Sequence, residues 1–282
     1  MQGLVELSKP RITQLVVLTA AAGYFLGSHG PFRLGTFLAT LLGTALVAAG
    51  TNAMNMIRER DIDARMRRTR SRPLPAGRVS PRTAVVFAVT SAVLGLVVLV
   101  WWVNLLTAGL AALTLASYVW AYTSLKRRST LNTLVGAVPG ALPVLGGWTG
   151  AGGSLDPAGW ALFWLLFLWQ LPHFLALAWM YREDYRTAQL KMLSVEDSDG
   201  TRTARMALLY AVALVPVSLL PSLLGVTRVA YFTGALLLGL AYVGASLLML
   251  RDPNRRAAWV FVASIIYLPA VLTLAVLDKV SS

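Results

Sequence analysis

Nine apolar stretches, each long enough to cross a lipid bilayer as a helix, constrain this chain more than any other feature of its sequence. A helix needs about 20 residues to span the hydrocarbon core, and only helices and closed barrels satisfy their backbone groups in lipid. The stretches are rich in Leu, Ala and Val and do not alternate with period two, which favours helices. We predict an all-α, polytopic membrane helix bundle that forms one domain over residues 1–282, with spans at about 12–28, 34–57, 83–103, 105–125, 130–149, 157–181, 203–221, 229–250 and 257–277.

The basic residues lie almost entirely on alternate connections between these predicted spans. Arg33, Arg228 and Lys279 fall on one side, and the other 22 of the 25 Lys and Arg residues fall on the opposite side. The positive-inside rule then places the amino terminus in the cytoplasm and the carboxyl terminus outside, which requires an odd number of spans. Much of the net charge of +13 is therefore a topology signal, so we expect a lipid bilayer as partner and no nucleic acid. No separate mitochondrial transit segment is apparent, and we expect a bacterial cytoplasmic membrane.

A polar cluster follows the second predicted span. If this helix continues, Asn55, Glu59 and Asp63 recur every four residues and share one face, whereas Asp61 lies elsewhere. Two carboxylates and an amide oxygen are the hard oxygen ligands that Mg²⁺ prefers. The sequence contains no cysteine, which excludes a thiolate metal site. On spacing alone, a metal site and a solvated loop of carboxylates paired with neighbouring arginines fit this cluster equally well.

Arginines follow the cluster at once, at positions 65, 67, 68, 70 and 72. Carboxylates beside guanidinium groups suit a metal diphosphate, because metals bridge carboxylate and phosphate oxygens while arginines bind the remaining oxygens in bidentate fashion. Contact with anionic lipid headgroups is the better explanation for any single arginine.

Other polar groups lie at helix ends on the same side of the membrane. The fourth predicted span ends with Tyr122 and Lys126 on one face, and Asn132 opens the fifth. His173, beside Pro172, lies about eight residues, or roughly 12 Å of helix, before the end of the sixth. Each has a common structural explanation: a snorkelling lysine with an interfacial tyrosine, and a hydrogen-bonded histidine. Their convergence on one side is the main indication of a site.

At these residues the chain resembles the UbiA superfamily of intramembrane prenyltransferases, and within it the protoheme IX farnesyltransferase (haem O synthase) subfamily. Asn55, Glu59 and Asp63 match the superfamily motif Asn-xxx-Asp/Glu-xxx-Asp. The chain departs from the pattern in two places: only Glu183 and Asp184 represent the second acidic motif, and residues 188–191 lack the expected glycine and proline. The resemblance covers residues 8 to 195, and its subfamily signatures lie at 8–13, 60–74, 122–132, 169–174, 183–185 and 192–193.

The resemblance implies a reaction and a set of site residues. The reaction is Mg²⁺-dependent transfer of a farnesyl group from farnesyl diphosphate to a vinyl group of haem b, which is a substrate and not a fixed cofactor. Water then captures the resulting cation, giving haem O and diphosphate. The implied residues are the metal ligands Asn55, Glu59, Asp63 and Asp184, the catalytic Tyr122 and Lys126, and the substrate-binding Lys9, Arg11, Arg67, Arg70, Arg72, Arg127, Asn132, His173 and Arg182.

Several points stay open from the sequence. His173 could coordinate haem iron, orient the porphyrin or form a structural hydrogen bond, and the product could pass directly to a downstream haem A synthase. Three rival functions also remain: a UbiA-type enzyme with an aromatic acceptor, an anion transporter with a basic cytoplasmic vestibule, and an assembly factor for a respiratory oxidase. The transporter predicts carboxylates paired with arginine and no Mg²⁺ dependence, and the assembly factor predicts that Asn55, Glu59 and Asp63 are replaceable.

Overall fold

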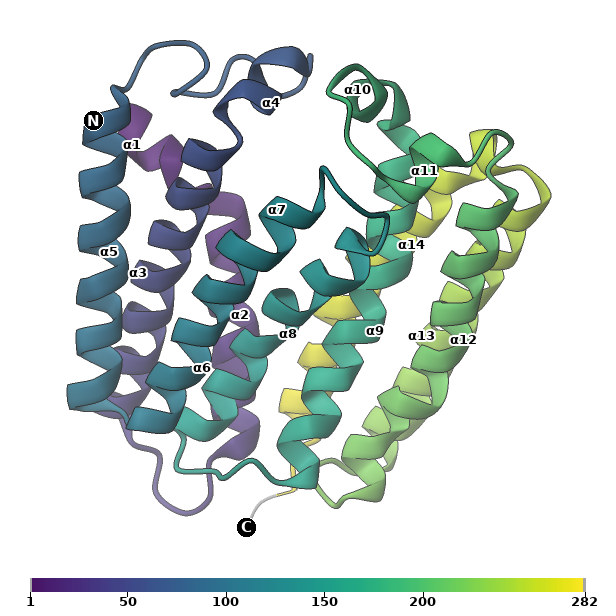
Figure 1. Cartoon of the computed structure of the whole chain (residues 1–282). Coiled ribbons are helices and arrows are strands. Elements are labelled where there is room, and N and C mark those ends of the chain that lie inside the picture. The colour runs from purple at the N-terminus through teal and green to yellow at the C-terminus, as the bar shows by residue number, and fades with distance from the viewer. Residues whose placement is uncertain (1, 281–282) are drawn as a thin grey trace.

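The computed structural model describes residues 2–280, and nearly all of them are helical (Figure 1). One isolated antiparallel β-bridge joins Thr227 and Lys279. The prediction of an all-α bundle is therefore confirmed. The helices are α1 (Gln2–Leu7), α2 (Pro10–Gly27), α3 (Leu34–Arg58), α4 (Arg60–Arg65), α5 (Pro81–Trp102), α6 (Leu105–Ala116), the π-helix η1 (Ser117–Tyr122), α7 (Thr123–Leu125), α8 (Asn132–Gly150), α9 (Pro157–Met180), α10 (Arg182–Thr187), α11 (Leu193–Glu196), α12 (Thr201–Leu223), α13 (Val229–Arg251) and α14 (Pro253–Leu277).

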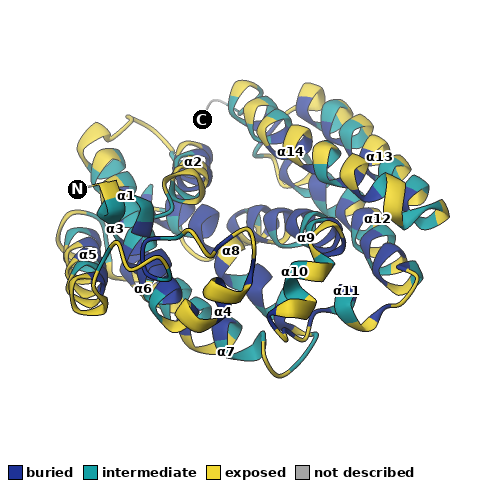
Figure 2. Cartoon of the chain, turned by 90° about the horizontal axis from the view of Figure 1, so that it is seen from above, coloured by how far each residue is buried: buried dark blue, intermediate teal, exposed yellow. Residues whose placement is uncertain are grey.

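Seven helical segments in the described chain are long and apolar enough to cross a membrane: α3, α5, Leu105–Leu125, α9, α12, α13 and α14. The predicted spans at 12–28 and 130–149 correspond to α2 and α8, which fall outside this set. Helix α8 contains Pro139, Pro143 and several glycines, and most of its residues are buried between other helices (Figure 2). Because other helices surround α8, few of its side chains face lipid, so the helix does not need to be apolar throughout. The count of nine spans stays a prediction.

Capping residues explain where several long helices begin. Ser80, Asn104, Asp156 and Asp252 each precede a helix, and the side chain of each accepts a hydrogen bond from a backbone amide of its first turn. Such caps satisfy amide groups that have no partner within the helix. Proline follows the cap of α5, α9 and α14, where its fixed φ suits the first helical position.

Glycines allow α2 and α8 to pack with their backbones in contact. A β-carbon on Gly147 would lie 1.9 Å from the carbonyl oxygen of Ala20, and one on Gly23 would lie 2.0 Å from that of Val144. Gly140, four residues after Gly136, leaves room for the side chain of Gln170 in α9. The backbone of α8 therefore forms part of the wall of the bundle interior.

Viewed from above, α2 and α14 stand on either side of an opening in the ring of helices (Figure 2). At one end, Lys279, just after α14, joins the two helices: its Nζ donates hydrogen bonds to the carbonyl oxygens of Phe25, at 2.7 Å, and Ser28, at 2.5 Å. Ile12 and Leu15, near the other end of α2, are 48% and 41% exposed. The opening therefore lies nearer the end that holds α1, α4 and α10.

Candidate active site

The three residues predicted as metal ligands lie where α3 breaks. Helix α3 ends at Arg58, Glu59 adopts a non-helical backbone conformation, and α4 begins at Arg60. Hydrogen bonds nevertheless continue from the amide of Glu59 to the carbonyl of Asn55 and from the amide of Asp63 to the carbonyl of Glu59. The four-residue repeat thus survives the break. All three side chains face the interior, with exposures of 1%, 4% and 0% for Asn55, Glu59 and Asp63.

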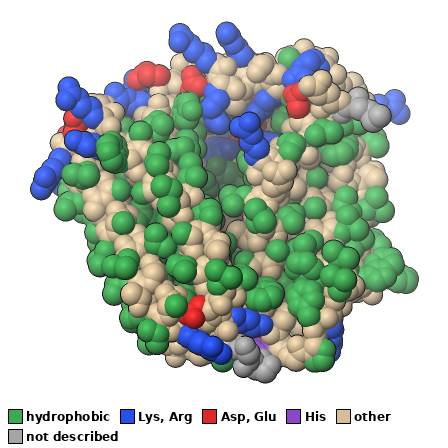
Figure 3. All heavy atoms as spheres, turned by 180° about the vertical axis from the view of Figure 1, so that it is seen from behind, with side chains coloured by type: hydrophobic (Ala, Val, Ile, Leu, Met, Phe, Trp, Pro, Cys, Tyr) green, Lys and Arg blue, Asp and Glu red, His purple; other side chains and the backbone are tan. Residues whose placement is uncertain are grey.

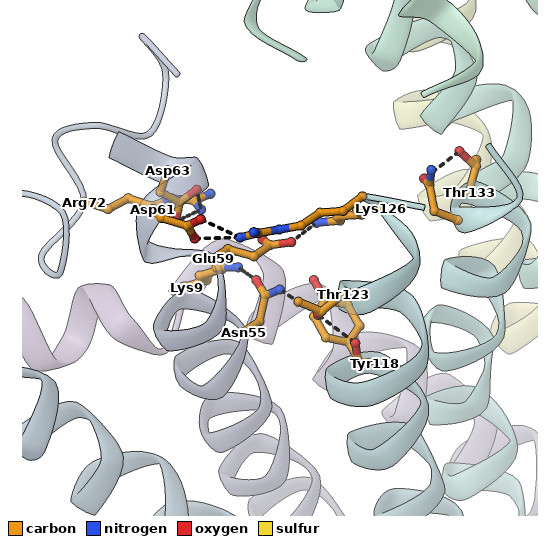
Figure 4. A network of polar contacts seen from close by, with 12 residues as sticks. Lys9, Asn55, Glu59, Asp61, Asp63, Arg72, Tyr118, Thr123, Lys126 and Thr133 are labelled. Atoms are coloured by element: carbon orange, nitrogen blue, oxygen red, sulfur yellow. Dashed lines mark hydrogen bonds and ion pairs between the residues drawn. The ribbon is translucent and has the colours of Figure 1, made fainter. Parts of the chain in front are cut away.

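Lys9 enters this cluster from the start of α2. Its Nζ donates a 2.7 Å hydrogen bond to Asn55 Oδ1, and Asn55 Nδ2 donates one of 3.1 Å to Thr123 Oγ1 (Figure 4). Lys9 has a φ of +47°, a left-handed conformation that is uncommon for a residue other than glycine. Strain of this kind tends to gather at functional sites. One amide side chain therefore joins three separate helical segments.

Each of the two buried carboxylates in this cluster is paired with a cation. Lys126 Nζ lies 2.8 Å from Glu59 Oε1, and Arg72 Nη1 donates to both oxygens of Asp63, at 2.8 and 2.7 Å. Asp61, outside the repeat, forms an exposed pair with Arg127 (Figure 4). Burying an unpaired carboxylate is costly, so this pairing is what the burial requires. The pairing of carboxylates with nearby cations that the sequence left open therefore occurs in this structure.

The pairs also set the charge state of the site. Burial acts to raise the pKa of Glu59, but Lys126, Lys9 and the amide of Asn55 outweigh it and lower that pKa. Burial acts to lower the pKa of Lys126, and Glu59 reverses this, raising it well above its ordinary value. Burial lowers the pKa of Lys9 to about 7, and the Arg72 guanidinium contributes to this. Glu59 is therefore ionised at neutral pH, among cations that suit a polyanionic ligand.

The π-helix η1 places two tyrosines beside Lys126. Lys126 Nζ lies 4.4 Å from the ring centroid of Tyr122, whose ring lies 5.1 Å from that of Tyr118. Gly136 on α8 makes room for this arrangement, because a β-carbon there would lie 2.6 Å from the Tyr122 ring. Single π-helical turns inside longer helices are frequent at functional sites. An aromatic face suits a cationic reaction centre.

The other predicted substrate-binding residues are more dispersed. Arg11, Arg67 and Arg70 are exposed, and their side chains form no hydrogen bond or ion pair with residues 2–280. Arg182 donates to Asn254 Oδ1 at 2.9 Å and lies over the ring of Trp179, so it contacts the start of α14 and not the acidic cluster.

Asn132 is fully buried and joins two loops. Its Nδ2 donates to the carbonyls of Ser129 and Lys191, both at 2.7 Å, and the amide of Lys191 donates to the carbonyl of Lys126 at 2.9 Å. Asn132 therefore holds the segment that carries Lys126 against the segment that follows α10.

Asp184 lies on α10, which faces the α4 region across the same end of the bundle (Figure 1). Its Oδ2 accepts a long 3.4 Å hydrogen bond from the amide of Arg68. A small apolar cluster that includes Ile62, Met66 and Leu190 packs the two loops together. Asp184 is therefore brought to the edge of the site, without contacting the three residues of the first motif.

A largely apolar cavity of about 420 Å³ extends from this cluster into the bundle. Tyr118 and Tyr122 line it near the acidic cluster, and Figure 3 shows a hollow between apolar side chains just beneath the basic end of the molecule. His173 also lines the cavity. Its Nδ1 lies 2.7 Å from Ser264 Oγ, and its ring stacks between those of Trp169 and Phe261, at centroid distances of 5.6 and 4.9 Å.

The donor set fits a hard divalent cation in part. The oxygens of Asn55, Glu59 and Asp63 are of the required type, and Glu59 Oε1 is buried without a hydrogen bond, although it lies near Lys126. No group of three or more His, Cys, Asp or Glu side chains within residues 2–280 is arranged to hold a metal ion by itself. Mg²⁺ commonly binds through one or two carboxylates plus substrate phosphates. The residues therefore fit a metal that binds together with a diphosphate.

Two residues of the network were not predicted from the sequence. Thr123 accepts from Asn55, and Tyr118 lines the cavity beneath Tyr122. Tyr118 lies four residues before Tyr122 and eight before Lys126, a helical spacing that could have singled it out. Thr123 has no such signal, because its contact depends on how α7 meets α3.

A sequence profile described as the UbiA prenyltransferase family matches residues 16–267. The chain belongs to the UbiA prenyltransferase family. It is therefore an enzyme of prenyl transfer and a multi-pass membrane protein.

Relatives and solved structures agree with this family. The chain is 45% identical over 289 residues to the protoheme IX farnesyltransferase of Solibacter usitatus, covering 99% of each chain, and 48% identical over 268 residues to that of Anaeromyxobacter sp., covering 94% of this chain and 89% of the relative. A structure of digeranylgeranylglyceryl phosphate synthase matches with a TM-score of 0.83 at 20% identity, covering 98% of this chain and 97% of that one. A UbiA homologue from Archaeoglobus fulgidus bound to GPP and Mg²⁺ matches with a TM-score of 0.69 at 15% identity, covering 97% and 99%.

Proposed function

We propose that this UbiA-family enzyme transfers the farnesyl group of farnesyl diphosphate to a vinyl group of haem b, giving haem O and diphosphate. The observation that carries the proposal is the 45% identity, over 99% of both chains, to a protein named protoheme IX farnesyltransferase. The acidic cluster with its surrounding cations and the adjoining apolar cavity are consistent with a diphosphate head and a prenyl tail. An aromatic acceptor would use the same diphosphate site, so the acceptor rests on the relatives and on the ring stack around His173.

The chain's own residues would act mainly on the leaving group. Asn55, Glu59, Asp63 and, from the facing loop, Asp184 would hold Mg²⁺, which would neutralise the charge that develops on the departing diphosphate. Lys126 and Arg72 now neutralise Glu59 and Asp63, and a bound metal would free both cations to contact phosphate oxygens. Arg11, Arg67 and Arg70 are exposed at the same end and available for further phosphate contacts.

The aromatic residues and the cavity would act on the organic groups. Tyr122, close beside Lys126, presents a ring that can stabilise the allylic cation at C1 while the vinyl group attacks it. The apolar cavity excludes bulk water from this cation until the new carbon–carbon bond has formed. Water then adds to the cation left on the former vinyl group and gives up a proton.

The distribution of charge supports one orientation of the protein in the membrane. Helices α1, α4 and α10 lie at the end of the bundle opposite the end of α14 (Figure 1), and Figure 3 shows Lys and Arg gathered at that end. The positive-inside rule supports a cytoplasmic location for this end in a bacterial cytoplasmic membrane, with the carboxyl terminus outside. The site would then face cytoplasmic farnesyl diphosphate.

The direct test is to incubate purified protein with haem b, farnesyl diphosphate and Mg²⁺ and to analyse the pigments by mass. We expect haem O from the wild type. Glu59→Gln and Asp63→Asn should lose at least about 100-fold in rate, because each removes a carboxylate that would hold the Mg²⁺ needed to neutralise the leaving group. Asp61→Asn is the matched control, since Asp61 is exposed and paired with Arg127 outside the cluster. Full turnover in both cluster variants would refute the metal assignment, and prenylation of an aromatic acid in place of haem would refute the acceptor.

A further inference from the structure

A second cavity, of about 370 Å³, lies between the ends of α8, α9, α11 and α12, apart from the site described above. Leu171 and Leu175 of α9 are buried at its floor, whereas Leu131 and Leu134 at its edge are 60% and 37% exposed. The remaining lining residues are Thr130, Thr133, Leu193, Arg202, Arg205, Met206 and Tyr210.

Two arginines lie on one edge of this groove. Arg202 and Arg205 are three residues apart in the first turns of α12, both are exposed, and neither side chain forms an ion pair or hydrogen bond within the described chain. The nearest acids in sequence are committed elsewhere, because Asp197 accepts from Thr203 and Asp199 from Thr201. Cations are unfavourable at the amino end of a helix, so helix stability does not explain this pair.

Together these features match one kind of ligand. The groove combines an apolar channel with two unpaired cations at the end of a membrane-spanning helix, the depth at which phospholipid headgroups lie. We propose that the groove binds an anionic phospholipid, with its phosphate at Arg202 and Arg205 and an acyl chain along Leu131, Leu134 and Leu175. Neither the prenyl donor nor the acceptor takes part, so the proposal does not depend on the acceptor assigned above.

A lipid in this groove would stabilise the segments that position Lys126 in the active site. It would contact the residues next to Asn132 on one side and Leu193 on the other. Asn132 donates to the carbonyl of Lys191, and the amide of Lys191 donates to the carbonyl of Lys126. The bound lipid would therefore restrain the two segments that together hold Lys126 in place.

Native mass spectrometry of the delipidated full chain tests binding. We expect one dioleoylphosphatidylglycerol to bind at least about tenfold more tightly than dioleoylphosphatidylcholine. The double variant Arg202→Gln/Arg205→Gln should weaken phosphatidylglycerol binding about 30-fold, as expected for two lost lipid contacts. Leu134→Trp, which fills the groove, should weaken both lipids. Arg82→Gln, which removes an exposed arginine at the start of α5, should change binding less than about threefold.

Amide hydrogen exchange tests whether bound lipid stabilises these segments. Phosphatidylglycerol should slow exchange in residues 126–134 and 187–193 of the wild type and leave both segments of the double variant unchanged. Three results would each overturn the proposal: equal binding of the two lipids, an Arg82→Gln effect as large as that of the double variant, or equal protection by inorganic phosphate alone.

Discussion

Removing the charge of Lys126 should lower the stability of the folded protein, because Glu59 would then be buried without its partner. The two side chains are 16% and 6% exposed and lie 2.8 Å apart, so this is a buried ion pair. Deleting one partner of such a pair costs about 3–5 kcal/mol, because the other charge stays buried. Because Lys9 also stabilises the charge on Glu59, we expect Lys126→Met to lose stability near the lower end of this range, at about 3 kcal/mol.

The measurement is the thermal midpoint of the purified protein in detergent without Mg²⁺ or diphosphate. A loss of about 3 kcal/mol corresponds to a fall of roughly 6–12 °C for a chain of this size. The matched control is Arg127→Met, the next residue along, which breaks the pair with Asp61. That pair is 50% and 53% exposed, so its loss should cost under about 1 kcal/mol.

The double variant Lys126→Met/Glu59→Gln decides whether charge is the cause. It should recover most of the lost stability, because neither charge remains buried. Mg²⁺ should also stabilise Lys126→Met more than the wild type, since a cation is then missing beside Glu59. A double variant no more stable than Lys126→Met would refute the reasoning.

Three other expectations follow from the site. Burial lowers the pKa of Lys9 to about 7, from an ordinary 10.5. Between these two pH values the unfolded chain therefore carries a proton on Lys9 that the folded chain lacks. The free energy of unfolding of the Mg²⁺-free protein should rise with pH across this window. Gly136→Ala should lower the prenyl transfer rate at least about tenfold by displacing the Tyr122 ring. Ser264→Ala should raise KM for haem about fivefold through its hydrogen bond to His173, with KM for farnesyl diphosphate unchanged.

Each of these has a distinct control. Lys9→Met should flatten the dependence of stability on pH, and an unchanged slope would show that another group titrates. Gly146→Ala also lies on the cavity wall but adds a β-carbon in open space, so it should retain activity. If Gly136→Ala is equally active, or Ser264→Ala raises both KM values alike, the corresponding role is wrong.

The sequence predicts the bundle well because lipid leaves few alternatives. Hydropathy and length place nine helical segments within a few residues of α2, α3, α5, α6–α7, α8, α9, α12, α13 and α14. The four-residue repeat likewise predicts that Asn55, Glu59 and Asp63 share one face, and in the structure all three side chains are buried.

Contacts between distant segments could not be predicted in this way. The break of α3 at Glu59 and the π-helix at Ser117–Tyr122 depend on packing against other helices, which local sequence does not record. The resemblance makes Arg72 a substrate ligand, whereas here it neutralises Asp63. Arg182 is drawn away by Asn254, a partner 72 residues later in the chain.

The hydrogen bonds of Lys279 to Phe25 and Ser28 have a consequence for how molecules reach the cavity. Because these bonds join α2 and the segment after α14 at one end, whereas Ile12 and Leu15 near the other end of α2 are exposed, we expect molecules to enter the cavity sideways from a single leaflet. A substrate dissolved in the bilayer then reaches the cavity by two-dimensional diffusion. Its supply depends on how densely prenyl chains populate that leaflet, and a product that keeps its tail returns to the leaflet from which the donor came.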